Sequence, residues 1–182
     1  PAAYCGIVGL KVTEGLLPLD GILPLAKTLD TPGPMTRSTL DAALMFEVLR
    51  GVAPADVNTA FETTNGIFQE MSRGVAGLKI GMLPDAWLNV YDGVMLDALK
   101  ESADLLKSLG AEIVPFTPRE SFDKYRDASG VISSAEGYQV NREIIDNPDS
   151  IMDRHVRKRM AEGRGISAAD YLDALDQRDQ TK

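Results

Sequence analysis

The sequence predicts an α/β fold in which a mixed β-sheet is flanked by helices. Residues 77–118 follow a strand, helix, strand pattern, and residues 119–182 carry long stretches of helical periodicity. Of the 182 residues, 44% are hydrophobic and 25% are charged, as in an ordinary globular protein. We therefore expect helices packed on a sheet around an apolar core.

Glycine and proline punctuate residues 1–37. They separate three short apolar runs, Gly6–Lys11, Leu16–Leu19 and Ile22–Leu25. Each run is too short for a stable helix. We expect this region to wind through the fold and to contribute one or two strands.

The first helix is predicted from about Thr39 to Arg50. Ser38 is its candidate N-cap, and Asp41 stands at the reciprocal position of a capping box. Gly51 suits the position just after the helix. The predicted apolar face consists of Leu40, Ala43, Leu44 and Val48.

A β-α-β unit follows a polar linker, residues 52–76, which is expected to hold one short helix. The predicted strands are Leu78–Leu83 and Ala111–Phe116, and the helix between them is capped by Asp92 and runs to about Leu109. This connection is long enough for parallel strands, with a right-handed crossover.

The C-terminal region is predicted to be mostly helical. One helix covers Ser121–Asp146, although two glycines weaken it, and another covers Ile151–Glu162. Ser167 and Asp170 form a candidate capping box for a last helix that begins at Ala168.

The charge of the chain argues against a nucleic-acid partner. The net charge is −8, which repels phosphates. The basic run Arg154–Arg159 is flanked by acidic residues and is interpreted as a solvated helix face. Since no stretch of 18 apolar residues exists, we expect no membrane partner. A single cysteine, Cys5, fits a reducing cytoplasm, the predicted location.

Generic catalytic motifs are absent from the sequence. We find no dinucleotide-binding or P-loop glycine pattern and no G-x-S-x-G element. His155 is the one histidine, so a zinc site with three or four ligands is not expected. Because His155 lies among basic residues, a Ser-His-Asp triad is not expected either. No cofactor or metal is predicted.

Two motifs resemble the amidase signature family. Pro1–Gly15 (P-A-A-Y-C-G-I-V-G-L-K-V-T-E-G) resembles the stretch after the nucleophile loop, although Val12 replaces the usual proline. Leu29–Ser38 (L-D-T-P-G-P-M-T-R-S) resembles the element L-D-x-x-G-P-[ML]-[AT]-R-[ST], which leads into a helix with D-A-A, here Asp41–Ala43. Gly77–Pro118 also resembles the family's G-L-[KR]-I-G strand, helix and L-G-A-E-V strand.

The resemblance implies the amidase-signature fold and hydrolysis of a carboxylic amide to an acid and ammonia or amine. The family uses a Ser–cis-Ser–Lys triad, in which a neutral lysine and a relaying serine activate the nucleophile and an acyl-enzyme forms. Backbone N–H groups of a glycine-rich loop stabilise the oxyanion. In the family the nucleophile lies four residues before the position of Pro1, and the other two residues lie further upstream. We therefore assign no catalytic residue and expect the chain to be inactive alone.

The chain is accordingly expected to be a fragment of a single amidase domain, with an incomplete fold. Residues 1–51 form a core segment, 52–76 the linker, 77–118 the β-α-β unit and 119–182 a helical region. Its expected partners are a small-molecule amide and either the remainder of the amidase chain or a second copy, as in a homodimer. An isolated fragment exposes strand edges and apolar surface that need such cover.

Four further residues of the N-terminal third are interpreted as structural. Lys11 belongs to the G-L-K element and does not match the catalytic lysine. Cys5 is expected to be a buried thiol, because its position in the family packs near the floor of the active site. Asp30 and Arg37 flank the Pro-Gly-Pro turn and are expected to bind backbone groups or each other. A substrate contact is the alternative for this pair.

Arg178 is the candidate substrate-binding residue. The predicted apolar face of the last helix consists of Ala168, Tyr171, Leu172, Leu175 and Arg178. An arginine on such a face needs an acidic or polar partner, and a substrate carboxylate is one. In the family's glutamine-using amidotransferases, an arginine at roughly this place binds the amino-acid carboxylate. The alternative is an exposed arginine near the chain end.

Three functions remain open from the sequence. A free amidase is favoured, because the segment from Gly15 to Leu29 leads into D-T-P-G-P without the polar insertion associated with the amidotransferase group. The second is the A-subunit of a glutamine-dependent tRNA amidotransferase. The third is a non-catalytic binding or structural module.

Overall fold

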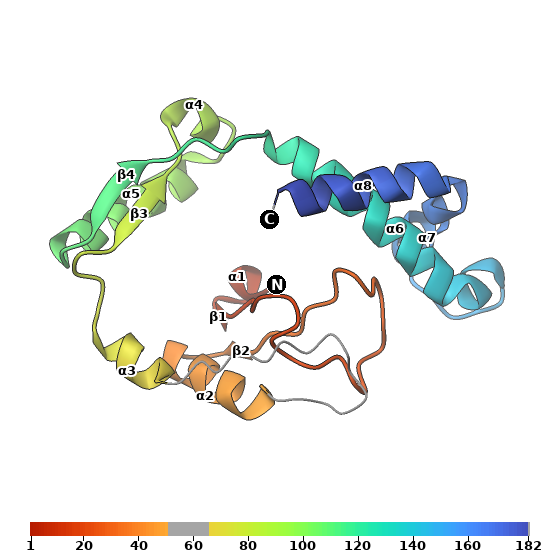
Figure 1. Ribbon diagram of the computed structural model, residues 1–182, viewed down its shortest axis with the longest axis horizontal. Coiled ribbons are helices and arrows are strands. Elements are labelled where there is room, and N and C mark those ends of the chain that lie inside the picture. Colours follow the sequence, from red (N-terminus) through yellow and green to blue (C-terminus); the bar gives the residue numbers. More distant parts are fainter. Residues whose placement is uncertain (51–65, 182) are drawn as a thin grey trace. The chain divides into compact units, whose positions relative to one another are not determined.

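The computed structural model describes residues 1–50 and 66–181, which belong to two compact units (Figure 1). The first unit comprises Pro1–Thr63 together with Ser121–Lys182, and the second unit comprises Thr64–Glu120. The segment that resembles a β-α-β unit thus lies in one unit, and the segments before and after it share the other.

The N-terminal half of the first unit contains two strands and two helices. In chain order they are α1 (Ala2–Cys5), β1 (Val8–Gly9), β2 (Met35–Thr36) and α2 (Thr39–Leu49). The strands pair antiparallel, with Val8 opposite Thr36. The expected contribution of one or two strands from this region is therefore confirmed, whereas α1 was not predicted.

Gly33 allows the backbone to close beside β1. Leu10 donates its N–H to the carbonyl oxygen of Pro34 over 3.0 Å, which extends the contact between the two strand segments. A Cβ atom on Gly33 would collide with the carbonyl oxygen of Leu10. The glycine of the Pro-Gly-Pro turn is therefore required by a close approach of two backbone segments.

Helix α2 begins as predicted but buries a different face. The Oγ atom of Ser38 accepts from the N–H of Asp41 over 3.1 Å, which confirms the N-cap. Its buried residues are Ala42, Ala43 and Phe46. The predicted face was wrong at Leu40, Leu44 and Val48, which are exposed. The helix contacts β1 and β2, and the face that it buries is a different one. Gly51 and most of the predicted linker lie outside the described residues.

The C-terminal half of the first unit is helical. Its elements are α6 (Phe122–Asp146), α7 (Arg154–Ala161), the short 3-10 helix η1 (Glu162–Gly165) and α8 (Ala168–Gln180). Helix α6 contacts each of the others. Ala128 and Ile132 of α6 and Ala174 of α8 form the centre of an apolar cluster, and Leu29 from the N-terminal half packs against it.

The caps of the last two helices follow from their sequences. Asp153 accepts from the N–H groups of His155 and Val156, so α7 begins three residues later than predicted. The predicted capping box of α8 is confirmed: Ser167 Oγ accepts from Asp170 N–H over 3.1 Å, and the Asp170 carboxylate accepts from Ser167 N–H over 3.3 Å.

The second unit contains the predicted β-α-β arrangement. Its elements are α3 (Ile67–Ser72), β3 (Lys79–Met82), α4 (Asp85–Leu88), α5 (Gly93–Ser108) and β4 (Glu112–Pro115). Strands β3 and β4 pair parallel, with Ile80 opposite Ile113. Asp92 caps α5 by accepting the N–H of Val94 over 2.9 Å. Helix α3 is the expected short helix before the unit, and α4 was not predicted.

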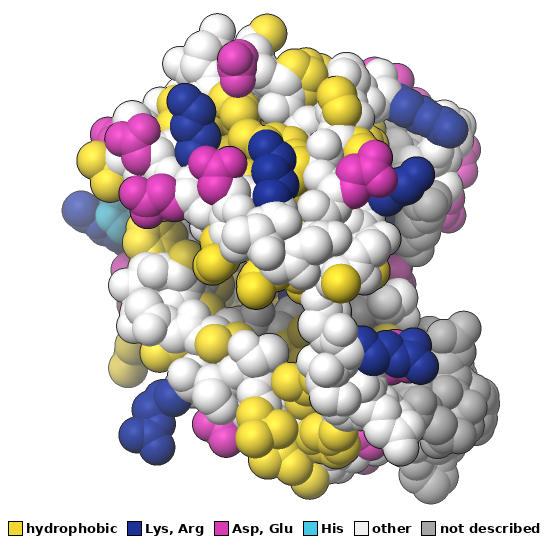
Figure 2. All heavy atoms as spheres, turned by 90° about the vertical axis from the view of Figure 1, so that its left-hand side faces the viewer, with side chains coloured by type: hydrophobic (Ala, Val, Ile, Leu, Met, Phe, Trp, Pro, Cys, Tyr) yellow, Lys and Arg dark blue, Asp and Glu magenta, His cyan; other side chains and the backbone are white. Residues whose placement is uncertain are grey.

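The α/β class is confirmed, and the described strands form one antiparallel pair and one parallel pair. Many large hydrophobic side chains lie at the surface, and Figure 2 shows them beside charged side chains on one face of the molecule. Leu23, Val48 and Val94 have exposed fractions of 86%, 83% and 76%. None of the helices in the described parts is long and apolar enough to cross a membrane.

Candidate functional site

Four residues from distant parts of the sequence meet in the first unit. Thr28 lies in the loop between β1 and β2, Glu136 lies on α6, and Tyr171 and Arg178 lie on α8. Thr28 is 108 residues from Glu136 and 150 residues from Arg178, and it contacts both. We call this cluster the Thr28 junction.

Glu136 is the centre of the junction. Its Oε2 atom accepts the backbone N–H of Thr28 over 2.9 Å. Its Oε1 atom accepts the Thr28 hydroxyl over 2.6 Å and the Tyr171 hydroxyl over 2.7 Å. The residue is only 9% exposed. Because burying a carboxylate without donors is costly, these three hydrogen bonds offset the cost of its burial.

Tyr171 has a shifted pKa as a result. Its hydrogen bond to Glu136 contributes most, followed by burial and by the negative charge of Glu136, and together they raise the pKa of Tyr171 to about 12. The positive charge of Arg178 acts in the opposite direction. Tyr171 is therefore a protonated donor at neutral pH.

Arg178 completes the junction. One terminal nitrogen, Nη1, donates to the carbonyl oxygen of Thr28 over 2.9 Å. Nε and Nη2 both lie 3.1 Å from Oδ1 of Asp179. The side chain is 21% exposed, so it is held against the N-terminal half and is not an exposed arginine at a chain end. These contacts use three of the five N–H groups of a guanidinium.

The inward face of α8 differs from the predicted one. Ala174 is buried and Tyr171 and Leu175 pack beside it, as the spacing i, i+3 and i+4 requires. Leu172, which was expected on this face, is 58% exposed, and Ala168 is exposed as well. The contact with α6 through Ala174 sets the rotation of the helix.

A small polar cavity lies beside Arg178. Its volume is about 120 Å³. Charged residues of both signs line it, namely Glu14, Lys27, Asp30 and Arg178. The lining is therefore balanced in charge, and Lys27 and Arg178 are its candidate partners for a carboxylate of a small ligand.

A larger cavity is lined in part by the same loop. It has a volume of about 560 Å³ and is lined by Glu136, Tyr171 and Arg142 among others. Lys27 and Thr28 line both cavities. The Lys27–Thr28 segment therefore forms part of the wall of each.

The Pro-Gly-Pro region behaves as a scaffold at Asp30. Its carboxylate accepts the N–H of Leu25 over 2.8 Å and that of Ala26 over 3.1 Å, which confirms the expected binding of backbone groups. This bonding fixes the turn that precedes the Thr28 junction. Arg37 is exposed and makes no such contact within the described residues.

Lys11 and Cys5 also have no catalytic neighbour in the described chain. The Nζ atom of Lys11 donates to the carbonyl oxygen of Val12 over 2.8 Å, in line with a structural role. The prediction of a buried thiol was wrong, because Cys5 lies on α1, which has no buried residue, and is exposed. No group of three or more His, Cys, Asp or Glu among the described residues is placed to hold a metal ion.

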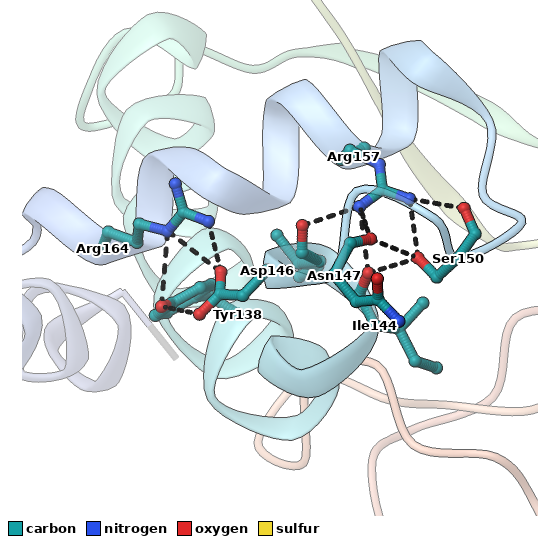
Figure 3. Close-up of polar contacts among 8 residues, drawn as sticks. Tyr138, Ile144, Asp146, Asn147, Ser150, Arg157 and Arg164 are labelled. Atoms are coloured by element: carbon teal, nitrogen blue, oxygen red, sulfur yellow. Dashed lines mark hydrogen bonds and ion pairs between the residues drawn. The ribbon is translucent and has the colours of Figure 1, made fainter.

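A second polar cluster borders the larger cavity through Tyr138 (Figure 3). The Tyr138 hydroxyl donates to Asp146 over 2.9 Å, and Arg164 binds both Asp146 and the Tyr138 hydroxyl. The guanidinium carbon of Arg164 lies 5.5 Å from the Tyr138 ring centroid. The hydrogen bond from Arg164 holds the pKa of Asp146 below its usual value. The cluster ties η1 to α6.

The spacing of residues along α6 indicates that Glu136 faces the core, although the residue was not predicted as part of a site. Ala128, Ile132 and Glu136 follow one another at four-residue spacing, so the carboxylate continues the core-facing stripe of α6. A charged residue on such a stripe predicts polar partners from elsewhere in the chain. Thr28 carried no comparable signal, because it lies in a loop.

A family model described as Amidase matches residues 1–180. The A-subunit of glutamyl-tRNA(Gln) amidotransferase from Bdellovibrio bacteriovorus is 40% identical over 114 residues, which are 63% of this chain and 23% of that protein. An amidase of Pseudomonas putida is 31% identical over 176 residues, which are 96% of this chain and 37% of that protein. The chain thus spans well under half the length of these relatives.

Solved structures share the fold. One, from a study of a vestigial protein complex and the evolutionary origins of an s-triazine catabolic enzyme, has a TM-score of 0.83 at 26% identity and covers 97% of this chain and 38% of its own. Another, described as the crystal structure of amidase, has a TM-score of 0.73 at 23% identity, with coverages of 96% and 36%. By the match to the family model over residues 1–180, the chain belongs to the amidase family.

Proposed function

We propose that the full-length protein containing this chain hydrolyses carboxylic amides to an acid and ammonia or amine through an acyl-enzyme. The match to the amidase family over residues 1–180 carries this proposal. The two motifs at residues 1–15 and 29–38 support it, because they resemble the segments that follow the family's nucleophile loop. In this proposal the catalytic serine, cis-serine and lysine lie upstream of Pro1, and no cofactor or metal takes part.

Within that enzyme, the chain supplies Arg178 for binding a carboxylate of the substrate. The residue is partly buried, lines the small polar cavity with Lys27, and has N–H groups beyond those that contact Thr28 and Asp179. An arginine with this arrangement recognises planar carboxylates by paired hydrogen bonds. The proposed substrates are therefore amides that also carry a carboxylate.

The A-subunit of a glutamine-dependent tRNA amidotransferase is the second candidate. Several relatives carry the name of the glutamyl-tRNA(Gln) enzyme, including those of Bdellovibrio bacteriovorus and Alkaliphilus metalliredigens, at 40% and 35% identity. In that case glutamine is the amide that Arg178 binds, and partner proteins complete the reaction. A cytoplasmic location is proposed for either enzyme.

Release of ammonia by the full-length protein tests the proposal. The panel comprises propionamide and benzamide as neutral amides, and L-asparagine, L-glutamine and succinamate as amides with a carboxylate. We expect turnover of at least one member, and none by residues 1–182 alone. Glutamine turnover that rises on addition of charged tRNA and the partner proteins favours the second candidate. A full-length protein without activity on any amide refutes hydrolysis and leaves the binding module.

Arg178→Ala tests the binding role. We expect its KM to rise about tenfold for amides with a carboxylate, because a charge-assisted pair of hydrogen bonds is lost, and to stay near the wild-type value for neutral amides. An equal change for both kinds of amide contradicts a carboxylate site at Arg178. Arg159→Ala, an exposed arginine on α7, is the control.

A further inference from the structure

We propose that Glu136 is a positioning residue that sets the place of Arg178 through Thr28. The inference rests on the proposed function, since it assigns a purpose to the arginine that binds the substrate carboxylate. Glu136 touches no substrate in this proposal. Glu136 accepts hydrogen bonds from the N–H and the hydroxyl of Thr28, and Arg178 donates to the carbonyl oxygen of that same residue. Glu136 therefore acts on Arg178 through Thr28.

The geometry of Thr28 carries the inference. Its backbone N–H and its hydroxyl are both held by the carboxylate of Glu136, at 2.9 and 2.6 Å. Two bonds to one rigid carboxylate fix the orientation of Thr28 about its backbone. The carbonyl oxygen of Thr28, which is the acceptor of Arg178 Nη1 at 2.9 Å, therefore belongs to a residue that is anchored on α6.

Local bonding orients this carbonyl within its turn, because the Thr28 carbonyl and the Leu29 N–H share one peptide group and that N–H donates to Ala26. These local bonds do not attach the turn to α6. Thr28 lies in a loop whose internal contacts run to Ala26: the N–H groups of Leu29 and Asp30 both donate to the Ala26 carbonyl oxygen over 2.8 Å. These bonds close the turn around Thr28 without holding its own N–H. Glu136 supplies that contact from α6, so the helix holds in place the turn that carries the acceptor of Arg178.

The consequence reaches both cavities. Thr28 lines the small polar cavity together with Arg178, and it lines the larger cavity together with Glu136 and Tyr171. Loss of the Glu136 carboxylate therefore releases a residue that lines both cavities. The expected effect is a displaced Arg178, and hence weaker binding of carboxylates with little change in the chemical step.

Steady-state kinetics of the full-length protein with Glu136→Ala and Glu136→Gln test the inference. Glu136→Ala should raise KM about fivefold to tenfold for the amide with a carboxylate, with kcat within threefold and neutral amides unaffected. Glu136→Gln should have a KM close to that of the wild type. Its side-chain carbonyl can accept the Thr28 N–H, and its NH₂ group can donate to the hydroxyls of Thr28 and Tyr171. Glu143→Ala, an exposed carboxylate further along α6, is the matched control.

The double variant Glu136→Ala/Arg178→Ala separates positioning from a general structural effect. If Glu136 acts through Arg178, the double variant is no weaker in binding than Arg178→Ala alone. The inference is overturned if the two substitutions raise KM independently, so that their factors multiply in the double variant. It is also overturned if KM rises equally for neutral amides.

An NMR measurement decides the inference without activity. The Nη–H signals of Arg178, identified by their loss in Arg178→Lys, should be sharp in the wild type, Glu136→Gln and Glu143→Ala, because Nη1 donates to Thr28. They should be broadened or absent in a folded Glu136→Ala. An unchanged signal in Glu136→Ala overturns the inference. If no amide is turned over but the signal changes as expected, the proposed function fails while the positioning by Glu136 stands.

Discussion

Arg157 shows how one side chain can close the end of a helix. It belongs to the basic run that was predicted to be a solvated face, yet it is partly buried. Its Nη1 atom lies within 2.9 Å of the carbonyl oxygens of Ile144, Ile145 and Asn147, and its Nη2 atom donates to Ser150 over 2.7 Å (Figure 3). A guanidinium here satisfies the last carbonyls of α6, which have no partner in their own helix.

Arg157→Ala should lower the free energy of unfolding by about 1.5–3 kcal/mol, the usual range for hydrogen bonds to a charged group. Arg157→Lys should recover little, because an ammonium cannot span the same acceptors. Chemical denaturation followed by circular dichroism measures both. Arg159→Ala on the exposed face of α7 is the control and should change stability by less than about 0.5 kcal/mol. Equal effects of the two alanine variants contradict this role of Arg157.

Tyr171 makes the stability of the first unit depend on alkaline pH. Its folded pKa of about 12 lies above the ordinary tyrosine value of 10.0, so the folded state holds this proton more tightly. The contribution is fully present below pH 10 and is lost as the pH rises from about 10 through 12. Tyr171→Phe should therefore be less stable than the wild type at pH 8, and the difference should shrink above pH 10. Tyr4→Phe, whose side chain is 99% exposed, should show no such pattern in denaturation at each pH.

At the scale of elements, α6 continues through two glycines for different reasons. A Cβ atom at Gly137 would lie 2.5 Å from the Sδ atom of Met160, which is only 1% exposed. A Cβ atom at Gly130 would meet nothing within 4 Å. Gly137 thus allows α7 to approach α6. Gly130 lowers the helix propensity and allows no close contact in exchange.

Alanine at these two positions should have opposite effects. Gly130→Ala should raise the free energy of unfolding by about 0.5–1 kcal/mol through helix propensity. Gly137→Ala should lower it by about 1–3 kcal/mol, because the new Cβ forces the buried Met160 side chain to shift. Thermal unfolding of the two variants under the same conditions is the measurement. Changes of the same sign would show that the contact between α6 and α7 does not depend on Gly137.

At the scale of the whole molecule, the exposed apolar side chains predict association. Each unit carries them: Leu23 and Val48 lie in the first, and Val90 and Val94 in the second, all at least 76% exposed. Strands β3 and β4 form a parallel pair, and parallel sheets are usually buried. Such surface fits a partner, either the remainder of an amidase chain or a second copy.

Residues 1–182 expressed alone should therefore self-associate. Sedimentation velocity at increasing concentration should show a rising weight-average sedimentation coefficient, and a hydrophobic dye should bind. Replacing Val48 and Val94 by serine should weaken both signals. A monomer at all concentrations that binds no dye would refute this expectation. It would also show that the exposed apolar surface does not require a partner.

Prediction from the sequence succeeded where the information is local. The caps at Ser38, Asp92 and Ser167 and the parallel β-α-β unit were identified, because capping side chains bond within three residues and glycine ends a helix in place. Prediction failed where it depended on how a helix is rotated about its own axis. The buried faces of α2 and α8 were misassigned at Leu44 and Leu172, since several nearby faces carry apolar residues and periodicity does not choose among them.

The sequence by itself determined the element types, the family resemblance and the candidate role of Arg178. The tertiary structure decided what that arginine contacts: the backbone carbonyl of Thr28, 150 residues away, in a residue whose N–H and hydroxyl both donate to the buried Glu136. The physical reason is that capping and turn formation are short-range, whereas burying a carboxylate requires donors that only the folded chain brings together.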